Sequence, residues 1–329
     1  DSGGTVSLSL PVTVQADGVG AGSAVDMAND ITLTGTGDAV TINGANTGSV
    51  TTFSGSATIT TDDGQVTVED DSSLSNAVVV TVNSDSGDDG TGGAVAFNGD
   101  IGGDGGGNED LSIDAGDATV TIGAATTDTV SGRFGDLSID TTGTVTINAA
   151  VTGATIVTGT TRVPASIAFN ETIDLDNGGA GDVLDVTATD VTFATAADVA
   201  TTNGGNVLLT GQGAASDLTI NDATAGALDI AGSFTATNFD NSFLLGESIT
   251  ADGGVTVSGG TTLTLTENVT LDTDDTGGAA VQTEAIRAEG AATRENLIVI
   301  AGSGGVTVSG LVGGAAGGAP LGTLNIRTA

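Results

Sequence analysis

Several residue types are missing from this chain of 329 residues, and each absence excludes a class of function. There is no cysteine, histidine, lysine, tryptophan or tyrosine. Without cysteine the chain forms no disulfide and no thiolate metal site. Without histidine, cysteine and lysine, the usual catalytic triads, zinc sites and Schiff-base chemistry are excluded as well. We therefore expect a protein that is not an enzyme.

Positive charge is scarce, with 5 arginines against 42 acidic residues and a formal net charge of −37. Nucleic-acid binding needs a basic stripe, and an anionic membrane surface would repel this chain. The sequence also lacks an apolar run of about 18 residues, so we expect no membrane insertion. Calcium is a natural counter-charge for such a surface, although solubility and mutual repulsion in salty surroundings explain the same composition.

Large side chains are few, because the chain has 54 glycines and only 8 phenylalanines. A core must therefore be made from small Val, Ile, Leu and Ala side chains in a regular stack. Disorder is the alternative for a Gly-rich acidic chain. The positive mean hydropathy and the apolar alternation along the sequence argue against it.

Two short patterns recur with one period. The first is Asp-Leu/Val-Ser/Thr-Ile/Phe, whose copies and looser echoes are separated by whole multiples of about 26.5 residues. It occurs at 110–113, 136–139, 190–193 and 217–220, with echoes at 297–299 and 324–326. The second is Val-Thr-Ile/Val, at 40–42, 66–68, 120–122, 145–147, 255–257 and 306–308. A longer match joins residues 95–103 to residues 306–314.

These repeats predict the fold. Each one holds two or three short runs of alternating apolar residues, rich in β-branched side chains and separated by Gly, Asn or Asp. Three strands and three corners use about 26 residues, which is one coil of a parallel β-solenoid. We expect an all-β, right-handed parallel β-helix of about twelve coils, continuous over residues 1–329, with Leu111 and Ile113 pointing inward. An array of β-sandwich domains is the alternative fold.

Residues 279–295 break the pattern. The segment is compatible with a helix and contains Arg287 and Arg294. We expect a loop or short helix inserted between coils there. It is also the candidate contact surface for an acidic neighbour.

Acidic residues gather at the expected corners, where stacked coils could pool the six to eight oxygens that calcium needs. A solvated corner without an ion explains the same residues. The candidate calcium ligands are Asp62, Asp63, Glu69, Asp70, Asp71, Asp85, Asp88, Asp89, Asp104, Asp272, Asp274 and Asp275. The glycine run at 102–107 lacks the aspartate of calcium-binding nonapeptide repeats, because Gly107 stands in its place. We interpret that run as a corner of the coil, where Asp104, Glu109 and Asp110 remain candidates for holding a cation.

Two further activities are less favoured. Some β-helix enzymes cleave polysaccharides with carboxylates, calcium and an arginine. Sugar sites favour aromatic platforms, however, and this chain has neither Trp nor Tyr. Ice binding needs a continuous Thr-x-Thr ladder, whereas the coil-spaced pairs here, at Thr32/Thr34 with Thr58/Thr60 and Thr119/Thr121 with Thr144/Thr146, lie in different phases.

The pattern that runs from Val95 to Gly103, followed by Leu-x-Ile strands with Asn, Thr and Asp at the corners, resembles the β-strand repeats of filamentous-haemagglutinin-like and autotransporter-like bacterial surface proteins. The resemblance implies an exported, right-handed β-helical stalk, adhesin or surface-fibre segment at the bacterial cell surface. Because the chain opens at Asp1 rather than Met, we also expect a processed or excised piece.

Two functions follow from this resemblance. The first is a structural rod that self-associates by coil stacking into an extracellular fibre, sheath or surface layer, since open solenoid ends need caps or partners. The second is an adhesin module that binds a glycan or a host protein through a lateral loop, for which residues 279–295 are the candidate.

Overall fold

A computed structural model describes residues 6–8, 10–16, 24–44, 50–87, 89–103, 109–132, 135–153, 155–175, 183–195, 197–221, 227–274, 277–289, 294–313 and 319–328. These residues form 38 strands and no helix. Three parallel sheets, A, B and C, contain 13, 12 and 13 strands. Up to β37 every third strand of the chain joins the same sheet, and β38 joins sheet C beside β36. The predicted parallel β-solenoid is therefore confirmed, and the β-sandwich alternative, which needs antiparallel strands, is excluded.

The chain forms two compact units, residues 1–167 and residues 168–329, and β20 (Ser166–Phe169) contains the boundary. In the first unit, sheet A consists of β1 (Val6–Leu8), β4 (Ile31–Thr36), β7 (Ala57–Asp62), β10 (Val79–Asn83), β13 (Asp110–Asp114), β16 (Asp136–Asp140) and β19 (Thr155–Thr158). Sheet B consists of β2 (Val12–Ala16), β5 (Val40–Gly44), β8 (Val66–Val68), β11 (Val95–Phe97), β14 (Val120–Ile122) and β17 (Thr144–Ile147). Sheet C consists of β3 (Ala24–Met27), β6 (Val50–Phe53), β9 (Asp71–Leu74), β12 (Ile101–Gly103), β15 (Thr129–Ser131) and β18 (Ala150–Thr152).

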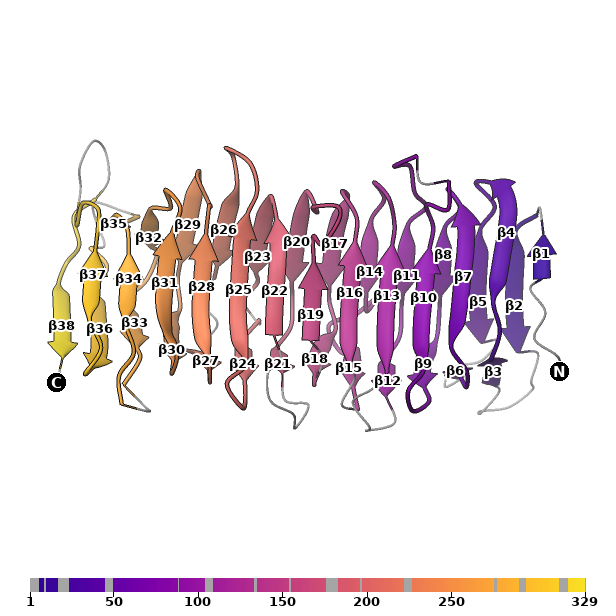
Figure 1. Ribbon diagram of the computed structural model, residues 1–329, viewed down its shortest axis with the longest axis horizontal. Coiled ribbons are helices and arrows are strands. Elements are labelled where there is room, and N and C mark those ends of the chain that lie inside the picture. The colour runs from indigo at the N-terminus through magenta and orange to yellow at the C-terminus, as the bar shows by residue number, and fades with distance from the viewer. Residues whose placement is uncertain are drawn as a thin grey trace. The chain divides into compact units, whose positions relative to one another are not determined.

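The second unit continues the same three-strand order up to β37. Its sheet A strands are β22 (Val183–Ala188), β25 (Asn206–Gly211), β28 (Ser233–Thr237), β31 (Gly254–Ser258), β34 (Val281–Thr283) and β37 (Val306–Val308), the first four of which lie side by side in Figure 1. Its sheet B strands are β23 (Asp190–Phe193), β26 (Asp217–Ile220), β29 (Ser242–Leu245), β32 (Leu263–Leu265) and β35 (Ile286–Ala288). Its sheet C strands are β21 (Ile173–Leu175), β24 (Val199–Thr201), β27 (Ala227–Ile230), β30 (Ser248–Ala251), β33 (Val269–Asp272), β36 (Leu297–Gly302) and β38 (Leu324–Thr328).

Alternation decides which side chains form the core. Leu111 and Ile113 are buried and Ser112 between them is partly exposed, as predicted. In sheet B the same inward position is valine in five successive strands that pair in register, from β5 to β17. Small β-branched side chains of equal size therefore stack one above another, and the core needs few aromatic rings.

Within each unit, the copies of the Val-Thr-Ile/Val pattern all lie in the same sheet. Its four copies in the first unit all lie in sheet B, and Val255 and Val306 both lie in sheet A, two coils apart. The Asp-Leu-Ser-Ile pattern does not keep one phase, because its copies at 110–113 and 136–139 lie in sheet A and those at 190–193 and 217–220 lie in sheet B. Its echoes at 297–299 and 324–326 lie in sheet C. Copies of this pattern therefore do not all mark one position in the coil.

The long match between residues 95–103 and residues 306–314 also joins different coil positions, because β11 belongs to sheet B and β37 to sheet A. Coil length varies as well. Leu111 pairs with Leu137 after 26 residues (137 − 111), whereas Val80 pairs with Leu111 after 31 (111 − 80) and Leu137 pairs with Ile156 after 19 (156 − 137). Corners of different length shift the pattern from one sheet to the next.

No described residue of the segment 279–295 is helical, and six of its residues form strands where we expected a loop or short helix. Val281–Thr283 and Ile286–Ala288 are the regular strands β34 and β35, and each pairs in register with the preceding coil. Residues 290–293 lie outside the described residues. Local helix compatibility was overridden here, because pairing and burial of Val281 and Ile286 stabilise the strand.

The corners between sheets A and B are closely stacked. A Cβ atom at Gly93 would lie 2.1 Å from the carbonyl oxygen of Gly64 in the preceding coil, so no larger residue fits without a backbone shift. At Gly116, one coil further, the φ angle is +57°, in the left-handed region that glycine adopts most readily. Glycine therefore brings successive corners, and the acidic residues on them, close together.

Candidate metal centre

The sheet A to sheet B corner of the first unit carries a cluster of aspartates, which we call the acidic corner. Strands β7, β13 and β16 each end on an aspartate, and Asp85 follows the end of β10. Because parallel strands place their carboxyl ends at one edge of the sheet, these side chains gather there. The acidic corner consists of Asp62, Asp63, Asp85, Asp89, Asp114, Asp117 and Asp140.

Register places like charges next to each other. Asn83 pairs with Asp114, and Asp114 pairs with Asp140 on the next strand. Neighbouring strands are about 4.8 Å apart, so the two carboxylates repel each other. A positive charge at this edge is therefore needed to stabilise the stack.

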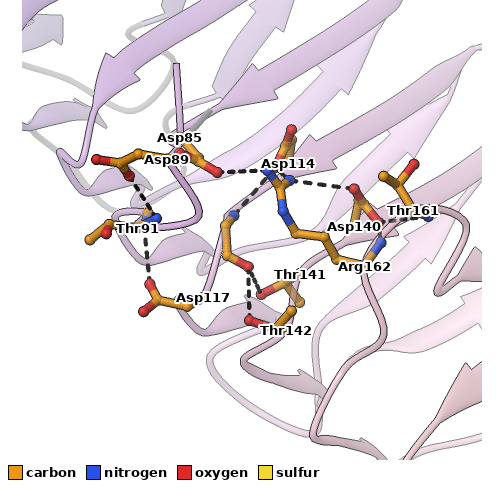
Figure 2. A network of polar contacts seen from close by, with 12 residues as sticks. Asp85, Asp89, Thr91, Asp114, Asp117, Asp140, Thr141, Thr142, Thr161 and Arg162 are labelled. Atoms are coloured by element: carbon orange, nitrogen blue, oxygen red, sulfur yellow. Dashed lines mark hydrogen bonds and ion pairs between the residues drawn. The ribbon is translucent and has the colours of Figure 1, made fainter. Parts of the chain in front are cut away.

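Arg162 supplies that charge from the turn after β19 (Figure 2). Its Nη2 lies 2.7 Å from Oδ2 of Asp85, and its Nη1 contacts Oδ1 of Asp114 and lies 3.5 Å from Oδ2 of Asp140. The backbone N–H groups of Thr161 and Arg162 also donate to Oδ1 of Asp140, at 3.2 and 2.6 Å. One guanidinium thus links carboxylates from three earlier coils, and the Asp85 side chain at its end is fully buried.

A second group of three carboxylates lies at the other end of the corner. One oxygen each of Asp63, Asp85 and Asp89 lies within 4.8 Å of the others, which is close enough to share a metal ion. Among the described residues no other set of three acids meets this distance. Oδ1 of Asp89 also accepts a hydrogen bond of 2.9 Å from the backbone N–H of Thr91, which fixes that side chain (Figure 2).

Asp63 is the residue of this group under most strain. Its φ angle is +60°, a left-handed conformation that aspartate tolerates better than most residues. Its buried Oδ1 accepts no hydrogen bond within the described residues. Desolvation, followed by the negative charges of Asp89, Asp62 and Asp117, raises the pKa of Asp63 above its ordinary value of 3.8. A bound cation would relieve both the desolvation and the repulsion.

The other predicted ligands lie elsewhere. Asp62 lies at the acidic corner, where its Oδ2 accepts a hydrogen bond of 2.8 Å from Thr36. Glu69, Asp70 and Asp71 lie at the corner between sheets B and C, where Glu69 accepts from Asn98 and Asp71 from the backbone of Asp100.

Asp272 and Asp274 belong to the corner after β33 in the second unit, and Oδ1 of Asp272 accepts from the N–H of Asp274. Asp88, Asp104 and Asp275 lie outside the described residues. Of the twelve predicted ligands, the structure therefore brings together Asp63, Asp85 and Asp89, with Asp62 beside them.

Sequence reasoning missed Asp114, Asp117, Asp140 and Arg162. A signal for two of them is present, because β13 and β16 both read Asp-Leu-Ser-Ile-Asp and the second aspartates pair in register. Arg162 has no such signal, since it reaches Asp85 from 77 residues away along the chain.

Among the described residues, none belongs to a helix that is long and apolar enough to cross a membrane. Comparisons with known protein families, with curated proteins and with solved structures find no match to this chain. The class that the fold defines is thus a parallel β-solenoid with an acidic corner.

Proposed function

We propose that the chain is a non-catalytic structural protein, an extracellular element of a bacterial surface fibre, sheath, surface layer or adhesin stalk that assembles by coil stacking. We place the protein at the bacterial cell surface because its strand repeats resemble those of filamentous-haemagglutinin-like and autotransporter-like surface proteins. The absence of histidine, cysteine and lysine favours a role without catalysis.

The regular stacking of the coils is the observation that carries this proposal. In all three sheets the strands pair in parallel with the preceding coil, as Val40, Val66 and Val95 do in sheet B. A parallel stack of this kind can add further strands at its edges, which is how one chain could pair with another.

Electron microscopy and sedimentation velocity of the purified chain test the proposal. We expect fibres or layers whose amount rises with protein concentration. Strictly monomeric behaviour across concentrations, salt and calcium would contradict it.

Calcium is the cofactor that we include in this proposal. One oxygen from each of Asp63, Asp85 and Asp89 gives three ligands, fewer than the six to eight that calcium takes, so we expect a weak site with Kd on the order of 10⁻⁴–10⁻³ M. Adding calcium should raise the melting temperature of the chain, and EDTA should reverse the change. The double variant D63N/D89N should lose this response, while the matched variant D272N/D274N in the second unit should keep it.

The alternative, an adhesin that binds through a lateral loop, is less favoured by the fold of residues 279–295. Its candidate loop at residues 279–295 contains the regular strands β34 and β35. Arg287 in this segment donates a hydrogen bond of 2.8 Å to Thr264 of the neighbouring strand, so it is engaged within the sheet.

A further inference from the structure

Two polar side chains point into the apolar interior of the first unit. Thr51 lies on β6 and Ser72 on β9, which are neighbours in sheet C (Figure 1), and the two residues pair in register. Both strands alternate between partly exposed and buried residues, and Thr51 and Ser72 occupy buried positions together with Phe53 and Leu74. The exposed fractions of Thr51 and Ser72 are 1% and 4%.

The neighbours of this pair are apolar. Along the inward column of sheet C, the residue before Thr51 is Val25 and the residue after Ser72 is Ile101. In the same two coils, the inward residues of sheet B are Val40, Ile42, Val66 and Val68, all of them fully buried. The two hydroxyl groups are thus removed from bulk solvent and flanked by hydrocarbon.

The hydroxyl oxygens of Thr51 and Ser72 form no hydrogen bond within the described part of the chain, either with each other or with another residue. Burying a hydroxyl without a partner is unfavourable, and nearly all such groups in folded proteins bond to protein atoms or to ordered water. Valine has the shape of threonine and would avoid this cost at position 51. Two such hydroxyls in one column therefore point to a polar ligand that both of them contact.

The spacing of the strands fits a single bridging water molecule. Neighbouring strands of a sheet lie about 4.8 Å apart, which sets the separation of paired side chains in one column. A direct bond between two hydroxyls requires about 2.8 Å, whereas a water bonded to both spans up to about 5.6 Å. Ser72 is smaller than Val25 and Ile101 in the same column, so its position can accommodate a water, which takes about 30 Å³.

We propose that Thr51 and Ser72 bind one water molecule inside the stack of coils, each through its hydroxyl group. The water joins the coil that contains β6 to the coil that contains β9 through their interior.

This site also distinguishes one pairing of coils from others. Valine, isoleucine and leucine replace one another in a core at modest cost, so a wholly apolar column distinguishes weakly between registers. A polar pair distinguishes strongly, because a shifted coil would leave each hydroxyl beside an apolar neighbour and without its bond. In a chain whose coils resemble one another, the bound water therefore helps to specify that β9 follows β6.

A double-mutant cycle tests the shared water. T51V keeps the shape of the side chain and removes the hydroxyl, and S72A removes the hydroxyl of the smaller residue. With a shared water, either change leaves the water and the other hydroxyl short of a bond, so each should lower the folding equilibrium constant about tenfold in urea titrations. The double variant T51V/S72A should lose little more than either single variant, instead of the roughly hundredfold loss that two independent sites would give.

The matched control is the outward pair on the same two strands, Thr52 and Ser73, which also pair in register and are partly exposed. T52V and S73A remove the same atoms at positions where bulk water replaces the lost bonds. Each should change the folding equilibrium constant by less than about threefold, and the two changes should be independent. Circular dichroism of every variant checks that the fold is retained.

Two results of the cycle would overturn the proposal. A folding equilibrium constant that rises in T51V and in S72A would show that the hydroxyls are buried without a ligand, because removing an unsatisfied polar group stabilises a core. Losses that multiply in the double variant would show that each hydroxyl bonds a separate partner.

A crystal structure of the unaltered chain gives a direct readout. We expect one ordered water within hydrogen-bond distance of Oγ1 of Thr51 and Oγ of Ser72, and no water at that place in T51V/S72A. A direct bond between the two hydroxyls, or a dry interior around them, would contradict the proposal. Neither measurement depends on assembly, so its failure leaves the proposed structural role untouched.

Discussion

At the scale of single residues, electrostatic repulsion at the acidic corner is a cost that the fold carries in the absence of a cation. Asp63 combines a left-handed backbone, a desolvated carboxyl oxygen and three neighbouring aspartates that raise its pKa. A strained backbone conformation persists when the surrounding structure holds the residue in place, and here the stacked corners hold Asp63.

The variant D63N tests this cost through its pH dependence. Because the folded pKa of Asp63 is raised above 3.8, its ionised form disfavours folding, and that penalty develops as pH rises through the unfolded and then the folded pKa. Asparagine is neutral and tolerates the left-handed conformation. We expect D63N to have a higher urea midpoint than the unaltered chain at pH 7, and the difference to vanish below about pH 3.8. An equal difference at both pH values would show that the charge of Asp63 is not the cause.

Arg162 has the opposite role at the same corner. Its removal leaves the buried Asp85 without its guanidinium and the paired Asp114 and Asp140 without a shared cation. We expect R162Q to lower the free energy of unfolding by roughly 2–4 kcal/mol. This range is below the usual cost of breaking a buried ion pair, because Asp114 is partly exposed and solvent screens its charge. R162K should be intermediate, because an ammonium group keeps the charge but not the planar fork. The control R287Q removes one hydrogen bond to Thr264 and should cost about 1 kcal/mol; equal losses in urea titrations of R162Q and R287Q would contradict this role.

At the scale of the strand, stability comes from inward columns that continue from one coil to the next. Phe169 and Phe193 illustrate this in the second unit, where their rings stack with centroids 4.9 Å apart and planes 13° apart. Phe193 also pairs in register with Ile220 of β26. A single side chain therefore supports the coil before it and the coil after it.

The variant F193A tests this dependence between coils. Deleting the ring should lower the free energy of unfolding by about 3–5 kcal/mol, and F193L should cost less because it leaves a smaller cavity. In hydrogen exchange, protection should fall first in β23 and β26, since each coil contacts only its neighbours. The control T192A changes an outward position of the same strand and should have little effect. Uniform loss of protection over the whole unit would contradict local coupling.

The sequence predicts elements better than it predicts their positions in the coil. Alternation identified β13 and β16 and the inward positions of Leu111 and Ile113, because a period of two has one physical meaning in a strand. It did not assign copies of one motif to sheets A, B and C, because coil lengths of 19 to 31 residues depend on the corners.

The candidate site was predicted only in part, because the sequence shows acidic clusters but not the corner on which each cluster lies. Asp63, Asp85 and Asp89 were among the proposed ligands, since acidic clusters are visible in the sequence. Their separation from Glu69 and Asp71, and the contribution of Arg162, depend on which corner each residue occupies. That assignment requires the register of strands that are far apart in the chain.

At the scale of the whole molecule, net charge opposes the compact state. A charge of −37 on 329 residues, with 5 arginines to offset 42 acids, produces repulsion that no single contact removes. Coil stacking adds to this repulsion, because register aligns carboxylates such as Asp114 and Asp140 on neighbouring strands.

Salt should therefore stabilise the chain by screening. Raising NaCl from 0.01 to 0.1 M shortens the Debye length from about 30 to about 10 Å, so repulsion between distant corners falls. We expect the melting temperature, measured by circular dichroism at constant pH, to rise by several degrees over this range. Tetramethylammonium chloride at equal ionic strength should have the same effect, because screening does not depend on the identity of the cation. Calcium should act beyond screening, and only its additional effect should be lost in D63N/D89N. A melting temperature that is insensitive to both monovalent salts would show that the fold tolerates its net charge without screening.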